Sequence, residues 1–246
     1  MDLIELKNNI IKKFKGSPSE LQTILNSIED DQSVFPFNEY EFLLCTLIEK
    51  KHITYNDYLN IRADYIKNNP NLWLFEMSGP RDFGEKFAQT YLQGICNDLL
   101  YPDKKLDEKY SGEYDFFLPF QKFGIRIEVK ASRAVDKDSE EPLYKRALSY
   151  PTQKRFLMNF QQLKPQCCDV FIWLAVFRNT IIIWILNSKE VKNHPDFSYG
   201  QHRGNKGNEG QLHITEKNFS TLDKYQLKNI SLKTAIINAY KRMKNV

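Results

Sequence analysis

The sequence predicts an α/β (α+β) protein in which helices flank a mixed central β-sheet. Residues 125–130 alternate strictly between apolar and charged side chains, as in a half-buried strand. Residues 169–177 and 180–186 are apolar runs rich in β-branched and aromatic side chains, which is typical of strands buried on both faces. Residues 83–100 repeat apolar side chains at helical spacing ahead of these strands. This order indicates a sheet with helices packed against it.

The chain has 246 residues, of which 41% are hydrophobic and 27% are charged. That length is enough for one large domain, or for a catalytic domain with a smaller appendage, without disulfides. The four cysteines show no zinc-binding spacing, so we expect buried thiols in a reducing compartment. No segment resembles a signal peptide, and Arg178 and Asn179 interrupt the longest apolar stretch. We therefore expect a cytoplasmic protein without a membrane span.

We expect the chain to divide into an N-terminal helical region, residues 1–77, and a second domain, residues 78–246. Amphipathic segments within residues 1–29 precede two helices, one capped by Asn38 and one opened by Thr54.

The second domain is expected to begin with a helix that Asp82 caps. Two strands, residues 113–120 and 125–130, follow this helix. Pro142 favours a further helix start, and residues 153–164 predict another helix. The two apolar strands come last, which gives the order helix, strand, strand, helix or helices, strand, strand.

Positive and negative charges are divided unevenly along the chain. Residues 1–142 hold 18 Lys and Arg against 25 Asp and Glu, a net charge of −7, and residues 143–246 hold 17 against 6, a net of +11. A polyanion-binding surface beside a metal-binding cluster would produce such a division. A solvated lysine-rich surface would give the same distribution, so charge alone leaves both interpretations open.

Three reactive side chains converge on the predicted pair of strands. The alternation places Glu128 and Lys130 on one face, about 6.5–7 Å apart along the strand. A turn about Gln121–Lys122 would pair position 115 close to position 128, so Asp115 would lie across from Glu128. Two carboxylates that face each other repel unless a hard cation lies between them, and Mg²⁺ prefers oxygen ligands of this kind.

A metal ion bound between these carboxylates would polarise a phosphate oxygen and lower the pKa of a bound water. The carbonyl oxygen of Val129 could supply a further ligand. Lys130 is placed to hold that water or help deprotonate it, and to offset charge on a reacting phosphate. The pattern therefore predicts phosphodiester chemistry on a hard cation.

Asp115, followed after twelve residues by Glu128-Val129-Lys130 on the next strand, resembles the PD-(D/E)xK signature of the nuclease superfamily that includes most type II restriction endonucleases. The resemblance covers residues 81–186 and an α-β-β-β-α-β order, and Tyr114 stands where the nominal motif has proline. It implies a restriction-endonuclease-like fold in which Asp115, Glu128 and Lys130 are catalytic and in which Asp115, Glu128 and Val129 bind metal. It also implies one or two Mg²⁺ per active site, replaceable by Mn²⁺, and products with 5′-phosphate and 3′-hydroxyl ends.

The same resemblance suggests roles for residues outside the hairpin. Many members of the superfamily place an acidic metal ligand on the preceding helix, where Glu85 stands here; a surface charge is the alternative. Gln161, on the helix predicted over residues 153–164, would contact the metal-bound water or the phosphate, unless it only forms the polar face of that helix. Lys154 and Arg155 suit phosphate contacts.

Residues 194–213 hold four of the ten glycines and three of the four histidines. A flexible backbone with polar donors suits the reading of base edges in a DNA groove. Arg203 is the first choice for contacting a guanine, and the other residues assigned to DNA are Gln201, His202, Asn205 and Lys206. A solvated loop without a DNA role is the alternative.

Three classes of function remain open: a sequence-specific endonuclease of the type II restriction class, a structure- or lesion-directed nuclease of repair or recombination, and a DNA-binding module that does not cut. Size and the polar loop favour the first, whose substrate is double-stranded DNA. A two-fold recognition site predicts a homodimer. A cognate DNA methyltransferase would act in the same system but not in a complex. Residues 78–246 would then be the nuclease domain, and residues 1–77 a dimer interface or a clasp on DNA.

Overall fold

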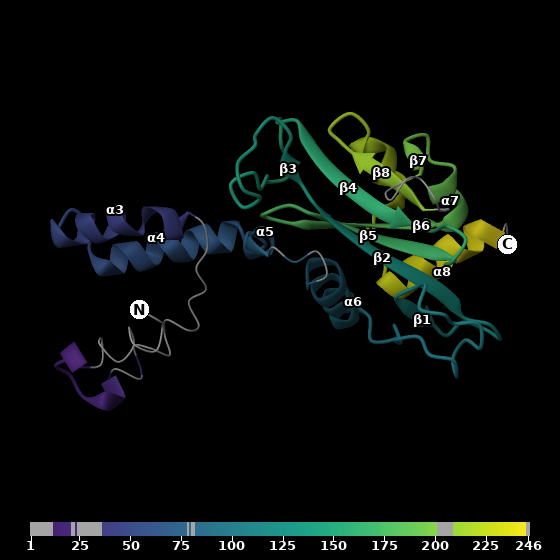
Figure 1. Ribbon diagram of the computed structural model, residues 1–246, viewed down its shortest axis with the longest axis horizontal. Helices are drawn as coiled ribbons and strands as arrows, with labels where there is room; N and C mark the ends of the chain where they lie inside the picture. The colour runs from purple at the N-terminus through teal and green to yellow at the C-terminus, as the bar shows by residue number, and fades with distance from the viewer. Residues whose placement is uncertain are drawn as a thin grey trace. The chain divides into compact units, whose positions relative to one another are not determined.

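The computed structural model describes residues 12–20, 23, 36–77, 79, 82–200 and 209–244 (Figure 1). The chain forms two compact units, Met1–Tyr58 and Leu59–Val246. Residues 59–77, which the sequence grouped with the N-terminal helices, belong to the second unit. Among the described helices, none combines the length and the apolar character needed to span a lipid bilayer.

The two long helices α3 and α4 differ in how they begin. α3 (Phe37–Glu49) starts one residue before Asn38, without a side-chain cap, so the prediction that Asn38 caps it is wrong. α4 (Tyr55–Asn68) begins after Thr54 as predicted. The amide of Asp57 donates to Thr54 Oγ1 (3.0 Å), and the amide of Thr54 donates to Asp57 Oδ2 (2.8 Å). This reciprocal pair satisfies two amides that a helix start leaves unpaired.

The second unit contains a mixed four-stranded sheet with the strand order β1-β2-β5-β6. β1 (Phe116–Leu118) is antiparallel to β2 (Ile125–Arg133), β2 is parallel to β5 (Val170–Val176), and β5 is antiparallel to β6 (Ile181–Asn187). The predicted mixed sheet with helices is confirmed. β1 is shorter than the predicted strand, and β2 is longer.

β5 and β6 are confirmed as strands buried on both faces. Every residue of β5 is buried, and only Ile181 of β6 is partly exposed. Trp173 and Trp184 are register partners and both are fully buried. The Trp173 ring stacks on Phe160 with centroids 4.9 Å apart, and Phe160 belongs to a second sheet. These aromatic contacts form the core between the two sheets.

The second sheet has the order β3-β4-β8-β7, with antiparallel pairs throughout. Its strands are β3 (Val135–Asp136), β4 (Phe156–Leu163), β7 (Phe197–Tyr199) and β8 (Gly210–Ile214). The helix predicted over residues 153–164 is therefore wrong. From Phe156 to Gln161, side chains of β4 alternate between buried and partly exposed with a period of two. Its partner β8 lies far along the chain, and this pairing outweighs the local helical pattern.

The strand β4 also changes the connection between β2 and β5. The resemblance implied a helix there, whereas the chain passes through β3 and β4 of the second sheet. Pro142 starts a single turn rather than a helix, with the amide of Lys145 donating to its carbonyl oxygen (3.0 Å). The described chain thus has the predicted mixed sheet but not the helical crossover.

Helices complete the second unit. The π-helix η1 (Asp82–Ala88) continues into α6 (Gln89–Ile95), and η1 packs against β2. Asp82 pairs with Lys86 one turn along (2.7 Å). Helix α8 packs against β5 and β6 (Figure 1). The remaining elements are α5 (Trp73–Glu76), α7 (Ser188–Lys192), the 3₁₀-helix η2 (Phe219–Tyr225) and α8 itself (Leu232–Lys244).

Candidate active site

The hairpin of β1 and β2 sets the register of the candidate residues. Phe116 pairs with Ile127, and the amide of Asp115 donates to the carbonyl oxygen of Ile127 (2.9 Å). Asp115 therefore lies opposite Glu128, as the turn position predicted. β1 extends no farther along β2 than this point. From Glu128 onward, the edge of β2 that faces away from β5 is bordered by no strand in the described part of the chain.

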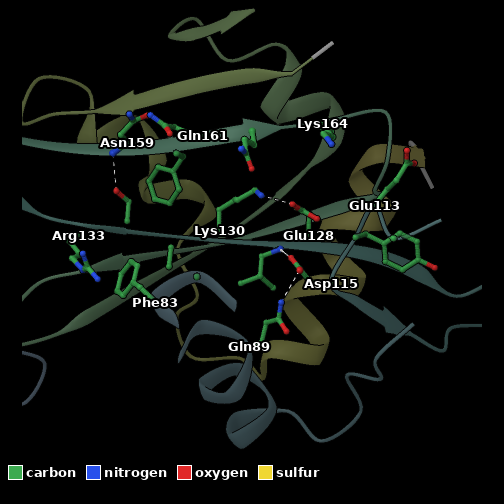
Figure 2. A pocket seen from close by; sticks show the side chains of 18 of the residues that line it. Phe83, Gln89, Glu113, Asp115, Glu128, Lys130, Arg133, Asn159, Gln161 and Lys164 are labelled. Atoms are coloured by element: carbon green, nitrogen blue, oxygen red, sulfur yellow. Dashed lines mark hydrogen bonds and ion pairs between the residues drawn. The ribbon is translucent and has the colours of Figure 1, made fainter. Parts of the chain in front are cut away.

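Asp115 is held at this open edge by two donors. Gln89 Nε2 of α6 donates to Asp115 Oδ1 (2.8 Å), and the amide of Val129 donates to Asp115 Oδ2 (2.7 Å) (Figure 2). The N–H and C=O of one residue in a strand point to the same side. The carbonyl of Val129 therefore points toward the edge where Asp115 lies. The carboxylate and the carbonyl predicted as metal ligands share one edge of β2.

Glu128 and Lys130 form a close ion pair. Glu128 Oε1 lies 2.6 Å from Lys130 Nζ, and the two side chains are only 14% and 22% exposed (Figure 2). Burial raises the pKa of Glu128 to about 7; the Lys130 ammonium opposes this rise and the charge of Asp115 adds to it. Ionisation of Glu128 is therefore costly. A further positive charge bound at the site would stabilise the ionised carboxylate of Glu128.

These residues line a pocket of about 1020 Å³ (Figure 2). One wall comes from η1 and α6 and includes Phe83 and Gln89, and the opposite wall comes from β4 and includes Asn159 and Gln161. The open edge of β2 lies between the two walls. Sites for small molecules usually measure about 300–1,000 Å³, so this pocket has room for a segment of a longer ligand.

The donor set suits a hard divalent cation. Asp115, Glu128 and the carbonyl of Val129 offer only oxygen, which is the ligand that Mg²⁺ prefers. No group of three or more His, Cys, Asp or Glu side chains suited to a metal occurs among the residues that the structure describes. Mg²⁺ commonly keeps several waters and binds through one or two carboxylates. Two carboxylates and one carbonyl are compatible with Mg²⁺ coordination of this kind.

Gln161 lies in the pocket but on a strand. It lines the β4 wall together with Gln162, at the place where the register between β4 and β8 shifts. Gln162 has a φ of +54°, a left-handed conformation that is uncommon for a residue with a side chain. Irregularities of this kind re-aim side chains and are frequent beside active sites.

Lys154 and Arg155 lie outside the pocket lining. Lys154 Nζ pairs with Asp136 (2.7 Å), and an Arg155 terminal nitrogen pairs with Asp138 (2.9 Å). Both cationic side chains are more than half exposed. Their phosphate contacts stay predictions, and such contacts would have to form on the surface rather than in this pocket.

The predicted base-reading residues lie outside the described residues: Gln201, His202, Arg203, Asn205 and Lys206. The backbone of Glu85 belongs to η1, but its side chain is also outside the described part. The roles assigned to these residues stay predictions.

Sequence reasoning missed several polar residues that line the pocket, among them Gln89, Arg133 and Lys164. Gln89 follows Glu85 by four residues, a helical spacing that could have pointed to it. Arg133 could not be placed without knowing that β2 continues beyond Lys130. Lys164 could not be placed because the segment before it was predicted as a helix.

Comparison with known proteins adds no assignment, since no model of a protein family matches the chain and no curated protein matches its sequence.

Proposed function

We propose that this chain is a Mg²⁺-dependent nuclease that hydrolyses phosphodiester bonds in double-stranded DNA. The observation that carries the proposal is that Asp115, at the open edge of β2, lines one pocket together with the paired Glu128 and Lys130 on the adjoining face of β2. Phosphodiester cleavage develops negative charge on the phosphate. Two carboxylates and an ammonium in a partly buried place suit that reaction.

Each residue of the site has its own proposed role. Asp115, Glu128 and the Val129 carbonyl would hold the cation, which supplies Lewis acidity toward a phosphate oxygen and a water when bound. Gln89 and the Val129 amide hold the Asp115 carboxylate in place, so that it needs little rearrangement. Lys130 donates toward the attacking water or the phosphate and offsets the developing negative charge.

The finer proposal is a type II restriction endonuclease that cuts a specific sequence and leaves 5′-phosphate and 3′-hydroxyl ends. The net charge of +11 on residues 143–246 and the glycine-rich polar segment at residues 194–213 support it. Such an enzyme would act as a homodimer on a two-fold site. A cognate DNA methyltransferase would act in the same system, without forming a complex with it. A repair or recombination nuclease would use the same catalytic residues on a different DNA structure.

A non-cleaving DNA-binding module is the second candidate. The observation that favours it is the ion pair of Glu128 and Lys130 at 2.6 Å, which neutralises both groups without a metal. In that case the pair would only stabilise the edge of β2.

Digestion of plasmid DNA with and without Mg²⁺, the latter in EDTA, separates these functions. Discrete fragments that require Mg²⁺ support the restriction endonuclease. Cleavage restricted to flaps, bubbles or lesions supports the repair nuclease. DNA that is shifted in a gel but stays intact with Mg²⁺ or Mn²⁺ contradicts the nuclease proposal and supports the binding module.

A further inference from the structure

The open edge of β2 extends well beyond the candidate metal site. Main-chain groups of Arg126 and Ala134 bond toward β5, so those of Val129, Ala131 and Arg133 point to the open side. Val129 and Arg133 are four residues apart, or about 13 Å along an extended strand. A ligand that follows this edge therefore reaches from the metal site to Arg133, which lines the far end of the same pocket.

Arg133 is held in a defined orientation there. The carbon of its guanidinium lies 3.9 Å from the ring centroid of Phe83, and one terminal nitrogen donates to the carbonyl oxygen of Met77 (2.8 Å). Its Nε is buried and has no hydrogen-bond partner among the described residues. A guanidinium carries five N–H donors in a fixed plane, so donors remain for a ligand.

Among the described residues, the positive charge of Arg133 also has no counter-ion. Of the other cations in the pocket, Lys130 pairs with Glu128 (2.6 Å) and Lys164 pairs with Glu209 (3.1 Å). In the described part of the chain no carboxylate pairs with Arg133, and burial lowers the pKa of its side chain to about 10. A partly buried cation without a counter-ion costs free energy that a bound anion would recover.

The two walls of the pocket differ in what they offer a ligand. The β4 wall presents the neutral amides of Asn159, Gln161 and Gln162, and Asn159 Oδ1 is a buried acceptor without a partner among the described residues. An acceptor repels a phosphate oxygen but can take a hydrogen bond from a base. Lys164, which follows β4, is already paired with Glu209, whereas Arg133 on the η1 wall has no counter-ion among the described residues. The η1 wall is therefore the wall on which an anion is favoured.

We propose that Arg133 binds a phosphate flanking the cleaved bond, a few nucleotides away on the same DNA strand, and so positions that strand along the open edge of β2. The inference rests on the proposed nuclease function. A DNA strand carries a phosphate at every nucleotide, so a strand that crosses the pocket brings one near Arg133. The planar guanidinium matches a phosphate through paired N–H donors.

The test measures binding separately from cleavage. A fluorescently labelled duplex is titrated in EDTA at several salt concentrations with the wild type, Arg133→Gln and Arg133→Lys. Loss of one phosphate contact should reduce the slope of log affinity against log salt by about 0.9 and weaken binding about tenfold at low salt. Arg133→Lys should keep most of the slope while losing part of the affinity. Lys192→Gln removes an exposed charge on α7, outside the pocket lining, and should leave the slope unchanged.

A wild-type slope in Arg133→Gln overturns the proposal even if the affinity falls. If Arg133 has a purely structural role, through Phe83 and Met77, Arg133→Gln lowers the melting temperature and the affinity for DNA. The salt slope, which reports the number of ions released, then stays unchanged. A third outcome also contradicts the proposal. If the wild type and Arg133→Gln show the same salt slope for DNA, and polyglutamate competes with DNA only for the wild type, Arg133 binds an acidic protein segment instead. If the wild type binds no DNA at all, the proposed function itself fails, which is a separate result.

Discussion

β2 and β5 lie side by side in parallel register, yet their sequences and surroundings differ sharply. All seven residues of β5 are fully buried, whereas residues of β2 alternate between buried and partly exposed from Ile125 to Lys130. β5 has β2 on one edge and β6 on the other. β2 beyond Ile127 has a strand on only one edge in the described structure. The strand with two paired edges forms the core, and the strand with one open edge carries the candidate site.

This contrast shows how a stable sheet can support a reactive edge. Glu128 and Lys130 are register partners of Phe171 and Trp173 in β5. Their backbone positions are therefore fixed by a strand that is itself fully packed. Groups built on rigid strands hold a catalytic geometry better than groups on loops. The open edge leaves the N–H and C=O of Val129 available to a side chain and to a ligand.

The largest expected effect is the loss of cleavage when the charges of β2 are removed. Glu128→Gln and Lys130→Met should each reduce the rate of Mg²⁺-dependent cleavage by about 10³-fold or more, because in the proposed reaction Glu128 holds the cation and Lys130 offsets charge on the phosphate. Duplex binding should survive in both variants. Glu128→Gln leaves the Lys130 ammonium without its partner, which should lower the melting temperature, so the cleavage rate is compared on protein shown to be folded.

Arg126→Gln is the matched control for these two variants. Arg126 shares their face of β2, but Asp169 anchors its guanidinium (3.1 Å) and it does not line the pocket. The folded variant should cleave at the wild-type rate. Wild-type cleavage in Glu128→Gln or Lys130→Met would contradict the site.

The sequence predicted features of this comparison whose signals are local. The alternation over residues 125–130 and the apolar runs predicted β2, β5 and β6, and the turn position placed Asp115 opposite Glu128. The prediction from sequence was wrong at β4, where it gave a helix, because Asn159 and the two following glutamines also suit the polar face of a helix. Only pairing with the distant β8 makes that segment a strand. Arg133 was missed because the predicted strand ended at Lys130, and because its place in the pocket depends on the packing of η1 against β2.

The contrast predicts that damage to β5 reduces stability rather than chemistry. Trp173→Ala should lower the free energy of unfolding by about 3–5 kcal/mol, because the side chain is fully buried and stacks on Phe160. Trp173→Phe is the control. It keeps an aromatic ring and removes an indole N–H that has no hydrogen-bond partner among the described residues, so its cost should be much smaller. Denaturant unfolding of both variants measures the difference, and a loss below about 1 kcal/mol in Trp173→Ala would show that β5 does not anchor the sheet.

A smaller effect is expected from the helix that supports the open edge. Gln89→Leu removes the donor of α6 to Asp115, so the Mg²⁺ concentration for half-maximal cleavage should rise about 10–100-fold. Cleavage at saturating Mg²⁺ should change less. Gln93→Leu, one turn farther along α6 and outside the pocket lining, should leave the Mg²⁺ dependence unchanged. An unchanged Mg²⁺ titration in Gln89→Leu would mean that Asp115 does not need this hydrogen bond.

The smallest effect separates the backbone of β2 from its side chains. Val129 is assigned to the site through its N–H and C=O alone, while its side chain is buried. Val129→Ala should therefore cost about 1–2 kcal/mol of stability, from two lost methyl groups, and leave the cleavage rate and Mg²⁺ dependence of the folded protein unchanged. Its register partner in β5, changed as Ile172→Ala, should cost about 2–5 kcal/mol, because that side chain is larger and fully buried. If Val129→Ala unfolds like the wild type but cleaves poorly, the side chain of Val129 shapes the site. The division between a structural β5 and a β2 that acts through its edge then no longer holds at this residue.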